Sequence, residues 1–400
     1  MTSRTLRCVP AVLWVSCVLV WWYCVGLTTT TPSSRPHHFH LRHQNHLRHP
    51  VPFVVTLCTG GSRSVAIAGV TTDERQLRQT IVMLKSAALA TRTRLRFILL
   101  SNDIDIYKKV CSKITQWPSE YSTRLSLEFR PIYVPSDSSI LEMYDKCSTE
   151  RLYLPRVLPD VDAVVYLDTD MIFLRAPELL AQQFQLFNQT QMFGMASIQG
   201  YYSAHTIKVP FVGKGFCGAP LLANLTRWRQ KPFEEQTLEN IITAFMDRIQ
   251  SGDQDVLNMM LIEKPHLVQQ LGCEWNGYME QCLELDYRCP RVQNVGFSVL
   301  HGFRGRFLTD EYFDYHAFNR ITFRAWEEHV LGAPLGALVS DLLASMRKAD
   351  LERRGDDGAP YLGAQFCRCL MKSLFLFFLD GRSNEKLREG IEVFCSVKLS

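Results

Sequence analysis

The sequence has no large excess of charge of either sign. It carries 44 lysines and arginines against 40 aspartates and glutamates, and its formal net charge is +4. A protein that binds nucleic acid mainly through the phosphates needs a clear surplus of basic side chains. The balance therefore predicts that the chain has no nucleic-acid partner. The sequence also shows no internal repeat, which excludes solenoid and propeller arrays.

Long apolar runs are scarce as well. Cys8–Leu27 is a run of 20 residues without a charge, which is long enough to cross a bilayer as a helix. Leu374–Leu379 has only six residues and predicts a buried helix face. Arg4 and Arg7 precede the long run, and this arrangement favours a cytoplasmic N-terminus. We interpret the run as an uncleaved signal anchor, with a cleaved signal peptide as the alternative.

The anchor sets the predicted organisation of the chain. The parts are a cytoplasmic tail at 1–7, a transmembrane signal anchor at 8–27, a flexible His-rich stem at 28–51 and a lumenal domain at 52–400 with a C-terminal helical part. The stem has no apolar periodicity, which is typical of a linker. Hydrophobic residues make up 46% of the chain, so we expect the lumenal domain to bury a substantial core.

Cysteine spacings typical of zinc fingers are absent. Ten cysteines follow the anchor, at positions 58, 111, 147, 217, 273, 282, 289, 367, 369 and 395. An oxidising lumen favours disulfides for several of them, and their pairing cannot be deduced from the sequence. Two N-glycosylation sequons, Asn188-Gln-Thr190 and Asn224-Leu-Thr226, fit the same compartment.

Strand and helix patterns alternate through the first half of the lumenal domain. Short apolar runs predict strands at 53–58, 95–100, 127–134 and 164–167, and helical spacing predicts helices at 74–90, 104–114 and 149–157. This alternation predicts βαβ units and a mostly parallel sheet. Further on we expect helices at 178–187 and 255–262, short strands at 192–196 and 219–222, a core strand at 292–300, and helices over 325–400 that pack against the sheet.

Two carboxylates follow the most buried of these strands. Val164–Leu167 is continuously apolar, Asp168 and Asp170 come next with one threonine between them, and Met171–Leu174 is apolar again. In open α/β sheets ligands bind at the carboxyl ends of the strands. Two carboxylates in such a position suit Mg²⁺ or Mn²⁺, and such a cation can neutralise a diphosphate. The alternative is a solvated turn.

Two later segments carry groups that complete such a site. His301 ends the apolar run Ser298–Leu300, and its imidazole can serve as a further metal ligand. Gly302 and Gly305 permit close backbone approach to a phosphate, and Arg304 and Arg306 can pair with its oxygens. A surface turn with a structural histidine is the alternative.

A helix start supplies further polar groups. Asp253, Gln254 and Asp255 stand together at the beginning of the helix expected near 255–262. Asp255 can cap that helix, which leaves Asp253 and Gln254 to point into a cleft.

The ordered set of motifs resembles the family-eight retaining glycosyltransferases, the glycogenin-like enzymes of GT-A fold. That set is Leu167-Asp-Thr-Asp170, Asp253-Gln-Asp-Val-Leu-Asn258, Trp275-Asn276 and His301-Gly302. Finer features are similar to the glucoside xylosyltransferases, namely Met83–Ala87, Arg151–Pro155, Leu158–Asp162, Asn224–Arg227 and His301–Gly305. The resemblance extends over about residues 53–310 and implies an α/β, Rossmann-like nucleotide-sugar transferase.

The resemblance also implies roles for particular residues. Asp168, Asp170 and His301 would hold Mn²⁺, and the donor would be UDP-xylose. The donor contacts would be Arg151, Asp253 for the sugar, Gln254 beneath the anomeric carbon, and Cys58, Thr59 and Gly60 for the uridine. The acceptor would be O-linked glucose on EGF-like repeats of the Notch type. The enzyme would be a single-pass type II protein of the endoplasmic reticulum or Golgi membrane.

One position departs from the family pattern. Family members carry Asn-Ser-Gly or Asn-Ala-Gly where this chain has Cys217-Gly218-Ala219, and the asparagine normally helps to hold the donor sugar. Three alternatives therefore stay open: a xyloside xylosyltransferase, a UDP-glucose-dependent enzyme, and an inactive lumenal binding protein on the same scaffold.

Overall fold

The computed structural model describes residues 50–59, 72–133, 149–198, 215–230, 235–246, 248–249, 252–261, 264–278, 289–303, 305–308, 316–353, 370 and 373–374. These residues all belong to one unit of the chain, His46–Ser400. Among the helices in these ranges, none is both long and apolar enough to span a bilayer. The anchor at 8–27 and nearly all of the stem lie outside the described residues and stay predictions.

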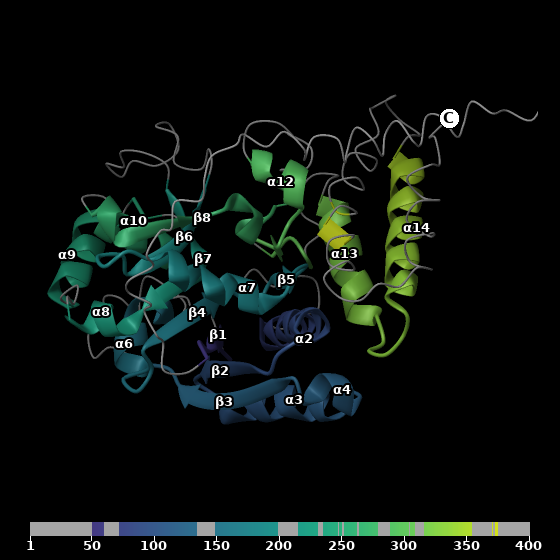
Figure 1. Cartoon of the computed structure of the whole chain (residues 1–400), viewed down its shortest axis with the longest axis horizontal. Helices are drawn as coiled ribbons and strands as arrows, with labels where there is room; N and C mark the ends of the chain where they lie inside the picture. Colours follow the sequence, from purple (N-terminus) through teal and green to yellow (C-terminus); the bar gives the residue numbers. More distant parts are fainter. Residues whose placement is uncertain are drawn as a thin grey trace, which may run out of the picture. The chain divides into compact units, whose positions relative to one another are not determined.

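A seven-stranded sheet forms the centre of the fold (Figure 1). Its spatial order is β3-β2-β1-β4-β7-β6-β8. The strands are β1 (Phe53–Leu57), β2 (Leu95–Ser101), β3 (Leu125–Pro131), β4 (Ala163–Leu167), β6 (Phe193–Ser197), β7 (Phe216–Asn224) and β8 (Val268–Leu271). Four of the six neighbouring pairs are parallel, and β7 is antiparallel to both of its neighbours. The mostly parallel sheet is thus confirmed, whereas β8 is a strand that the sequence patterns did not reveal.

Helices cover both faces of this sheet because strands such as β1, β4 and β6 are buried on both sides. Phe53 and Val55 of β1 pack with α2 (Thr72–Ala90) and α3 (Ile104–Thr115). Val54, which points to the other face, packs in a second core. The helices of that second core are α6 (Leu154–Val157), α8 (Leu225–Gln230), α9 (Glu235–Phe245) and α10 (Asp253–Leu261). Figure 1 shows α9 and α10 on the far side of the sheet from α2.

Two predicted helices each occur as a pair of shorter ones. The first is a 3-10 helix, η1 (Glu150–Tyr153), followed by α6, in which Pro155 occupies the first turn. The second is α7 (Pro177–Ala181), followed by the 3-10 helix η2 (Gln182–Leu186). Proline lacks a backbone N–H and fits only the first turn of a helix. Pro155 accounts for the new start at α6, whereas no proline stands at the break between α7 and η2. The remaining short helices are α4 (Ser119–Ser122) and the 3-10 helices η3 (Pro265–Leu267) and η4 (Cys273–Asn276).

A second, two-stranded sheet joins β5 (Met171–Phe173) to β9 (Val299–His301) in antiparallel register. The core strand predicted over 292–300 is confirmed only at its end, by β9. Its first half is wrong, because Pro290–Val295 forms helix α12. Pro290 stands at the start of that helix, and Gly296 ends it with a φ of +65°. Only glycine adopts such a backbone readily, and the chain turns there into β9.

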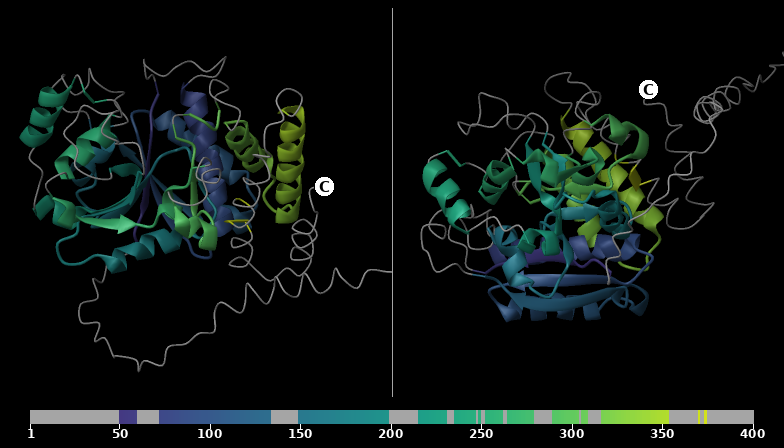
Figure 2. Two further views of the ribbon diagram at one scale, coloured as in Figure 1. Left: turned by 90° about the horizontal axis from the view of Figure 1, so that it is seen from above. Right: turned by 60° about the vertical axis from the view of Figure 1, so that its left-hand side comes forward.

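The C-terminal helices pack beside α2 and the second sheet. Helix α13 (His316–Glu328) lies between α2 and α14 (Leu335–Arg353), as Figures 1 and 2 show. Apolar residues of both helices share a core with Ile172 of β5 and Leu300 of β9, so the sheet that they contact in this core is the two-stranded one. Buried Lys85 of α2 donates hydrogen bonds to the carbonyls of Trp326, Glu327 and His329 at 3.2, 2.8 and 2.9 Å. A lysine thereby satisfies carbonyls at the end of α13 that have no partner within the helix. The Met83–Ala87 motif consequently has a structural role here.

Candidate metal and nucleotide-sugar site

The Asp-Thr-Asp triplet lies where β4 leaves the central sheet. All five residues of β4 are buried, and its end runs beside β1, with Leu167 opposite Val55. After Asp170 the chain enters β5 of the second sheet at once. The side chains of Asp168 and Asp170 keep 27% and 15% of their surface exposed. An added ion could therefore reach both carboxylates.

His301 joins these two carboxylates because of the register of the second sheet. His301 lies opposite Met171, and the amide of Gly302 donates to the carbonyl of Asp170 at 2.7 Å. The imidazole Nε2 is 3.5 Å from an oxygen of Asp168 and 3.4 Å from an oxygen of Asp170. One ligand atom from each of the three side chains lies within 4.8 Å of the other two. Residues 131 positions apart in sequence are thus brought together as the motif order predicted.

The protonation of this trio reflects its crowding. Burial works to lower the pKa of His301, but the charges of Asp170 and Asp168 raise it well above its usual value. Burial alone would raise the pKa of Asp168, and Arg151 together with His301 lowers it to about 2. In the absence of a cation, Asp168 is therefore ionised and balanced by positive neighbours. A divalent cation would take the place of the proton on His301.

Arg151 connects the metal candidates to the start of α10. This buried guanidinium donates to Asp168 at 2.8 Å and forms an ion pair with Asp253. It also lies over the ring of Tyr166, 4.9 Å from its centre. Burial raises the pKa of Asp253 to about 7 despite the guanidinium. The two carboxylates that share Arg151 therefore differ in basicity, with Asp253 much the easier to protonate.

Gln254 and Gly218 pack on the same guanidinium. The amide of Gly218 donates to Oε1 of Gln254 at 3.2 Å. A Cβ on Gly218 would lie 2.5 Å from Nη1 of Arg151 and 3.6 Å from Cβ of Gln254. The start of β7 is held to α10 by Asn258, whose side chain accepts from the Phe216 amide and donates to the Phe216 carbonyl. The Asp253–Asn258 motif thus brings Asp253 and Gln254 to the site and uses Asn258 as a structural tie.

Cys217, the residue that departs from the family pattern, is a buried free thiol. Its Sγ lies 3.5 Å from the hydroxyl of Tyr278. Burial works to raise the pKa of Cys217, but the neighbouring His301 lowers it below its usual value. Cys217 therefore faces the histidine side of the metal candidates, and the possibility that it forms a disulfide is removed.

Asn276 and Tyr278 also belong to the site. The sequence identified Asn276 only as part of a motif and gave no indication of Tyr278. Oδ1 of Asn276 lies 2.8 Å from Nδ1 of His301, and Nδ2 of Asn276 donates to the hydroxyl of Tyr278 at 2.6 Å. The only sequence signal was the proximity of these residues to Trp275. Their partner His301 is 25 positions away, so no local pattern could connect them.

The residues expected to contact uridine lie at the end of β1. The amide of Cys58 donates to Gln76 of α2 at 2.7 Å, and Cys58 is disulfide-bonded. Thr59 exchanges two hydrogen bonds of 3.0 Å with the side chain of Asn102, which follows β2. These bonds fix the two loops at the carboxyl edge of the sheet. Gly60 lies outside the described residues, and contact of this segment with uridine stays a prediction.

The residues expected to contact phosphate lie beyond β9. A Cβ on Gly302 would lie 2.3 Å from the ring of Phe307, so close packing already requires glycine there. Arg306 places its guanidinium 5.7 Å from the ring centre of Phe303. Arg304 lies outside the described residues. A role of Gly302 and Arg304 toward phosphate stays a prediction.

The donor set of the site fits a divalent cation. Two carboxylates and a neutral imidazole are ligands that suit Mn²⁺ and related ions, and the three donor atoms converge. An open α/β sheet with an Asp-x-Asp triplet at the end of a central strand, and a histidine returned beside it by a second sheet, defines the GT-A class of glycosyltransferases.

Comparison with known sequences places the chain within that class. The sequence matches the profile of Glycosyl transferase family 8 over residues 66–296, which is more than half of the chain. The protein therefore belongs to glycosyltransferase family 8.

Individual relatives agree with this assignment. The chain is 31% identical to mouse (Mus musculus) glucoside xylosyltransferase 2 over 277 residues, 65% of this chain and 60% of that protein. It is 29% identical to glucoside xylosyltransferase 1 of Danio rerio over 287 residues, 67% of this chain and 69% of that protein. The matched region thus spans three fifths of the mouse relative.

A solved structure shares the fold. It is the galactosyltransferase LgtC in complex with donor and acceptor sugar analogues, with a TM-score of 0.51 and 15% sequence identity over 70% of this chain and 98% of that one. At this identity the likeness concerns the fold alone.

Proposed function

We propose that the protein is a retaining xylosyltransferase that uses UDP-xylose and Mn²⁺ and adds xylose to O-linked glucose on EGF-like repeats of the Notch type. The observation that carries the proposal is the convergence of Asp168, Asp170 and His301 at the end of β4. The similarity to glucoside xylosyltransferases supports the choice of sugar and of a glucoside acceptor. The compartment would be the lumen of the endoplasmic reticulum or Golgi, with residues 8–27 as the membrane anchor.

In this proposal the three converging side chains hold the cation, which offsets the negative charge of the UDP leaving group. Arg151 supplies a second positive charge within the same buried region, and its contacts with Asp168 and Asp253 hold it in place. Fixed charges of this kind stabilise a developing charge without reorganisation during the reaction. The pair of Arg151 and the cation would therefore favour departure of the diphosphate.

Gln254 bears on how the configuration at the anomeric carbon is retained. An amide oxygen is a poor nucleophile, and Oε1 of Gln254 already accepts a hydrogen bond from the Gly218 amide. A double displacement through Gln254 is therefore disfavoured. We propose front-face attack, in which the leaving phosphate oxygen accepts the proton of the acceptor hydroxyl.

Cys217 gives one reason to consider a second function, that of an inactive lumenal binding protein. It stands where family members carry an asparagine toward the donor sugar, and a thiol is a weak hydrogen-bond partner. The intact trio of Asp168, Asp170 and His301 favours the active enzyme. If one buried hydroxyl of the donor loses its partner in this way, the donor would bind about 5- to 150-fold more weakly.

Calorimetric titration with UDP-xylose and UDP-glucose in Mn²⁺ tests the choice of donor. The proposal requires tighter binding of UDP-xylose, and Cys217→Asn is expected to tighten it further, since the thiol is not in a disulfide. Equal or tighter binding of UDP-glucose would contradict the xylosyltransferase and leave family membership intact. If neither nucleotide sugar binds, the result would instead favour the inactive scaffold.

A further inference from the structure

A chain of hydrogen bonds extends from the far side of the His301 ring, away from the carboxylates. Nδ1 of His301 lies 2.8 Å from Oδ1 of Asn276, and Nδ2 of Asn276 donates to the Tyr278 hydroxyl at 2.6 Å. The same hydroxyl lies 3.5 Å from the Cys217 thiol. The Tyr278 ring also stacks near the imidazole, with 5.9 Å between the ring centres. His301 is therefore bordered by Asn276 and Tyr278, which have no part in the proposed transfer.

This chain of bonds decides which ring nitrogen of His301 carries the proton. Because Nδ2 of Asn276 donates to Tyr278, its Oδ1 faces the imidazole, and a carbonyl oxygen can only accept. Nδ1 of His301 must then be a donor, so when a cation replaces the other ring proton the lone pair is left on Nε2. Nε2 is the nitrogen that lies 3.5 and 3.4 Å from the oxygens of Asp168 and Asp170. Only this tautomer can bind a cation among those carboxylates.

The backbone holds Asn276 and His301 in fixed relation. The amide of Gly277 donates to the carbonyl of Val299, and the amide of His301 donates to the carbonyl of Gly277, both at 2.9 Å. A Cβ on Gly277 would lie 2.2 Å from the ring of Phe297, so this close approach requires glycine. Asn276 is 2% exposed and His301 is 4% exposed. Water therefore has little access to replace the amide as the partner of Nδ1.

We propose that Asn276, supported by Tyr278, is a positioning residue that fixes the tautomer and orientation of His301 and thereby sets the affinity of the site for a divalent cation. The inference rests on the proposed metal-dependent function. Neither residue contacts the cation in this account. Residues that accept the N–H of a metal-bound histidine typically change metal affinity by about 10- to 100-fold when they are replaced.

The test measures Mn²⁺ binding by the full chain without donor, from the electron paramagnetic resonance signal of free Mn²⁺. Asn276→Leu removes the acceptor and keeps a similar volume, and it is expected to weaken Mn²⁺ binding by about 10- to 100-fold. Asn276→Asp retains an acceptor for Nδ1–H, and Tyr278 can donate to it, so binding is expected to stay within about threefold of the native value or to tighten. Tyr278→Phe keeps the ring and is expected to give a loss smaller than that of Asn276→Leu.

The matched control is Asn319→Leu on α13. Asn319 is 1% exposed, and its Nδ2 has no hydrogen-bond partner among the described residues. This change replaces a buried amide that does not contact His301, so it is expected to leave Mn²⁺ binding unchanged, whatever its effect on the thermal midpoint. If Asn276→Leu lowers Mn²⁺ affinity no more than this control does, the positioning role is wrong.

The possible results distinguish the positioning role of Asn276 from the existence of the metal site. Native affinity in Asn276→Leu, with Mn²⁺ binding by the unaltered chain, would overturn the positioning role and leave the metal site standing. Loss of binding in Asn276→Asp equal to that in Asn276→Leu would also overturn it, because the acceptor would then not matter. Absence of Mn²⁺ binding by the unaltered chain would overturn the metal site itself, and the positioning role with it.

Discussion

Two carboxylates share the guanidinium of Arg151, and the absence of a side chain at Gly218 makes room for it. Asp168 and Asp253 are held in one charge cluster although they leave different elements of the fold. The cluster has no space to spare on the side of β7, where a Cβ on Gly218 would come within 2.5 Å of the guanidinium. Arg151 is thus placed by charge on one side and by packing on the other.

Gly218→Ala is therefore expected to displace Arg151 and to lower turnover by about 100-fold, as a shift of about 1 Å in a charged group can do. Turnover and stability should be measured together. The control is Gly194→Ala in β6, where a Cβ would meet Leu222 at 3.0 Å and Phe187 at 3.1 Å, away from the site. This control is expected to lose about 1–3 kcal/mol of stability through overpacking and to keep its turnover. Normal turnover in Gly218→Ala would show that the position of Arg151 is not critical.

Glu150, next to Arg151, predicts an unusual pH dependence of stability. Burial raises the pKa of Glu150 to about 8 from 4.5, although its Oε1 accepts the Tyr133 amide at 2.7 Å. Oε2 is buried without a partner among the described residues. The folded state therefore binds a proton that the unfolded chain releases above pH 4.5. The contribution of Glu150 to the free energy of unfolding therefore falls as pH rises from 4.5 toward 8.

Glu150→Gln removes this titration and keeps an oxygen for the Tyr133 amide. It is expected to stabilise the fold by about 1–3 kcal/mol near neutral pH and by almost nothing near the unfolded-state pKa. Urea unfolding at the two pH values measures the difference. Exposed Glu120, which pairs with Arg124 on the surface, supplies the control, because Glu120→Gln should give no gain at either pH. A loss of stability in Glu150→Gln near neutral pH would contradict the buried, protonated carboxyl.

Individual residues of the site were predictable to different degrees. Asp168 and Asp170 could be identified from the sequence, because two carboxylates directly after a buried strand stand at the sheet edge where α/β folds bind ligands. The position of His301 beside them follows from motif order and is confirmed by the register of β5 and β9. Asn276 and Tyr278 were not predictable as partners of His301, since polar residues in a short 3-10 helix and the turn after it give no periodic signal.

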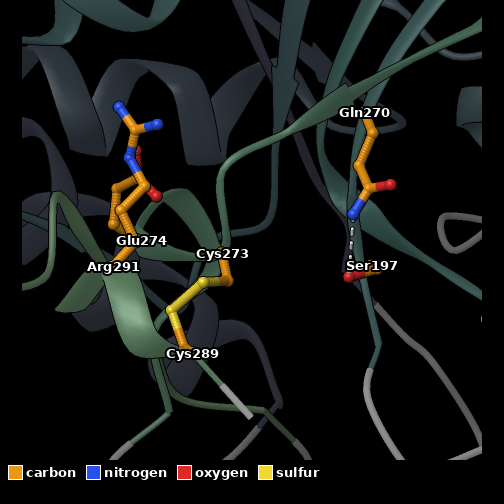
Figure 3. Close-up of a disulfide and its surroundings, with 6 residues drawn as sticks. All are labelled: Ser197, Gln270, Cys273, Glu274, Cys289 and Arg291. Carbon is orange, nitrogen blue, oxygen red and sulfur yellow. Dashed lines mark hydrogen bonds and ion pairs between the residues drawn. A yellow bond between two sulfur atoms is a disulfide. The ribbon is translucent and has the colours of Figure 1, made fainter. Parts of the chain in front are cut away.

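At the scale of elements, the disulfide between Cys273 and Cys289 joins the segment that carries Asn276 to the start of α12. The half-cystines are 16 residues apart with a Cα–Cα distance of 5.7 Å. Figure 3 shows the bridge beside Glu274, whose carboxylate pairs with Arg291 at 2.7 Å. In the same view Gln270 donates to Ser197 at 3.4 Å, which links β8 to β6. The 3-10 helix η4 is thus fastened at the end opposite to Asn276.

Replacement of Cys273 and Cys289 together by serine is expected to lower the free energy of unfolding by about 3 kcal/mol, as for other loops of about 15 residues. Denaturant unfolding measures the loss. Variants are preferable to a reducing agent, because Cys58 is also disulfide-bonded. Cys111→Ser, which alters a free and partly exposed thiol, is the control and should change stability little. Equal effects of the two replacements would mean that the bridge does not form.

Elements were predicted best where their periodicity was long or their apolar run was fully buried. Strands β1, β2 and β4 and helices α2 and α3 lie within a few residues of the expected bounds. The prediction of one strand over 292–300 was wrong because the apolar residues there belong to two elements, α12 and β9. The chain changes direction between them at Gly296, which has a positive φ. Strand β8 escaped because its four residues include two glutamines, so that it has no apolar run.

At the scale of the whole molecule, the expected membrane topology has its own test. If the uncharged run Cys8–Leu27 is an uncleaved anchor, protease added to intact microsomes should spare everything from about residue 30 onward. The sequons at Asn188 and Asn224 should then be accessible to the glycosylation machinery. Asn188 is exposed, and its Oδ1 accepts from the amide and hydroxyl of Thr190, whereas Asn224 is half-buried at the end of β7. The first sequon is therefore the better candidate for glycosylation. A mature N-terminus close to Leu27 would show instead a cleaved signal peptide.

We have proposed that Asp168, Asp170 and His301 form a metal site that serves xylosyl transfer. The most direct measurement is transfer of labelled xylose from UDP-xylose to an O-glucosylated EGF-like repeat, with and without Mn²⁺ after EDTA treatment, by the native chain and by Asp170→Ala. We expect product only from the native chain with Mn²⁺ restored, and Asp170→Ala to retain the native thermal midpoint, because Asp170 lies in a turn between strands. Full activity of Asp170→Ala with restored Mn²⁺, or undiminished activity of the native chain in EDTA, would contradict the account.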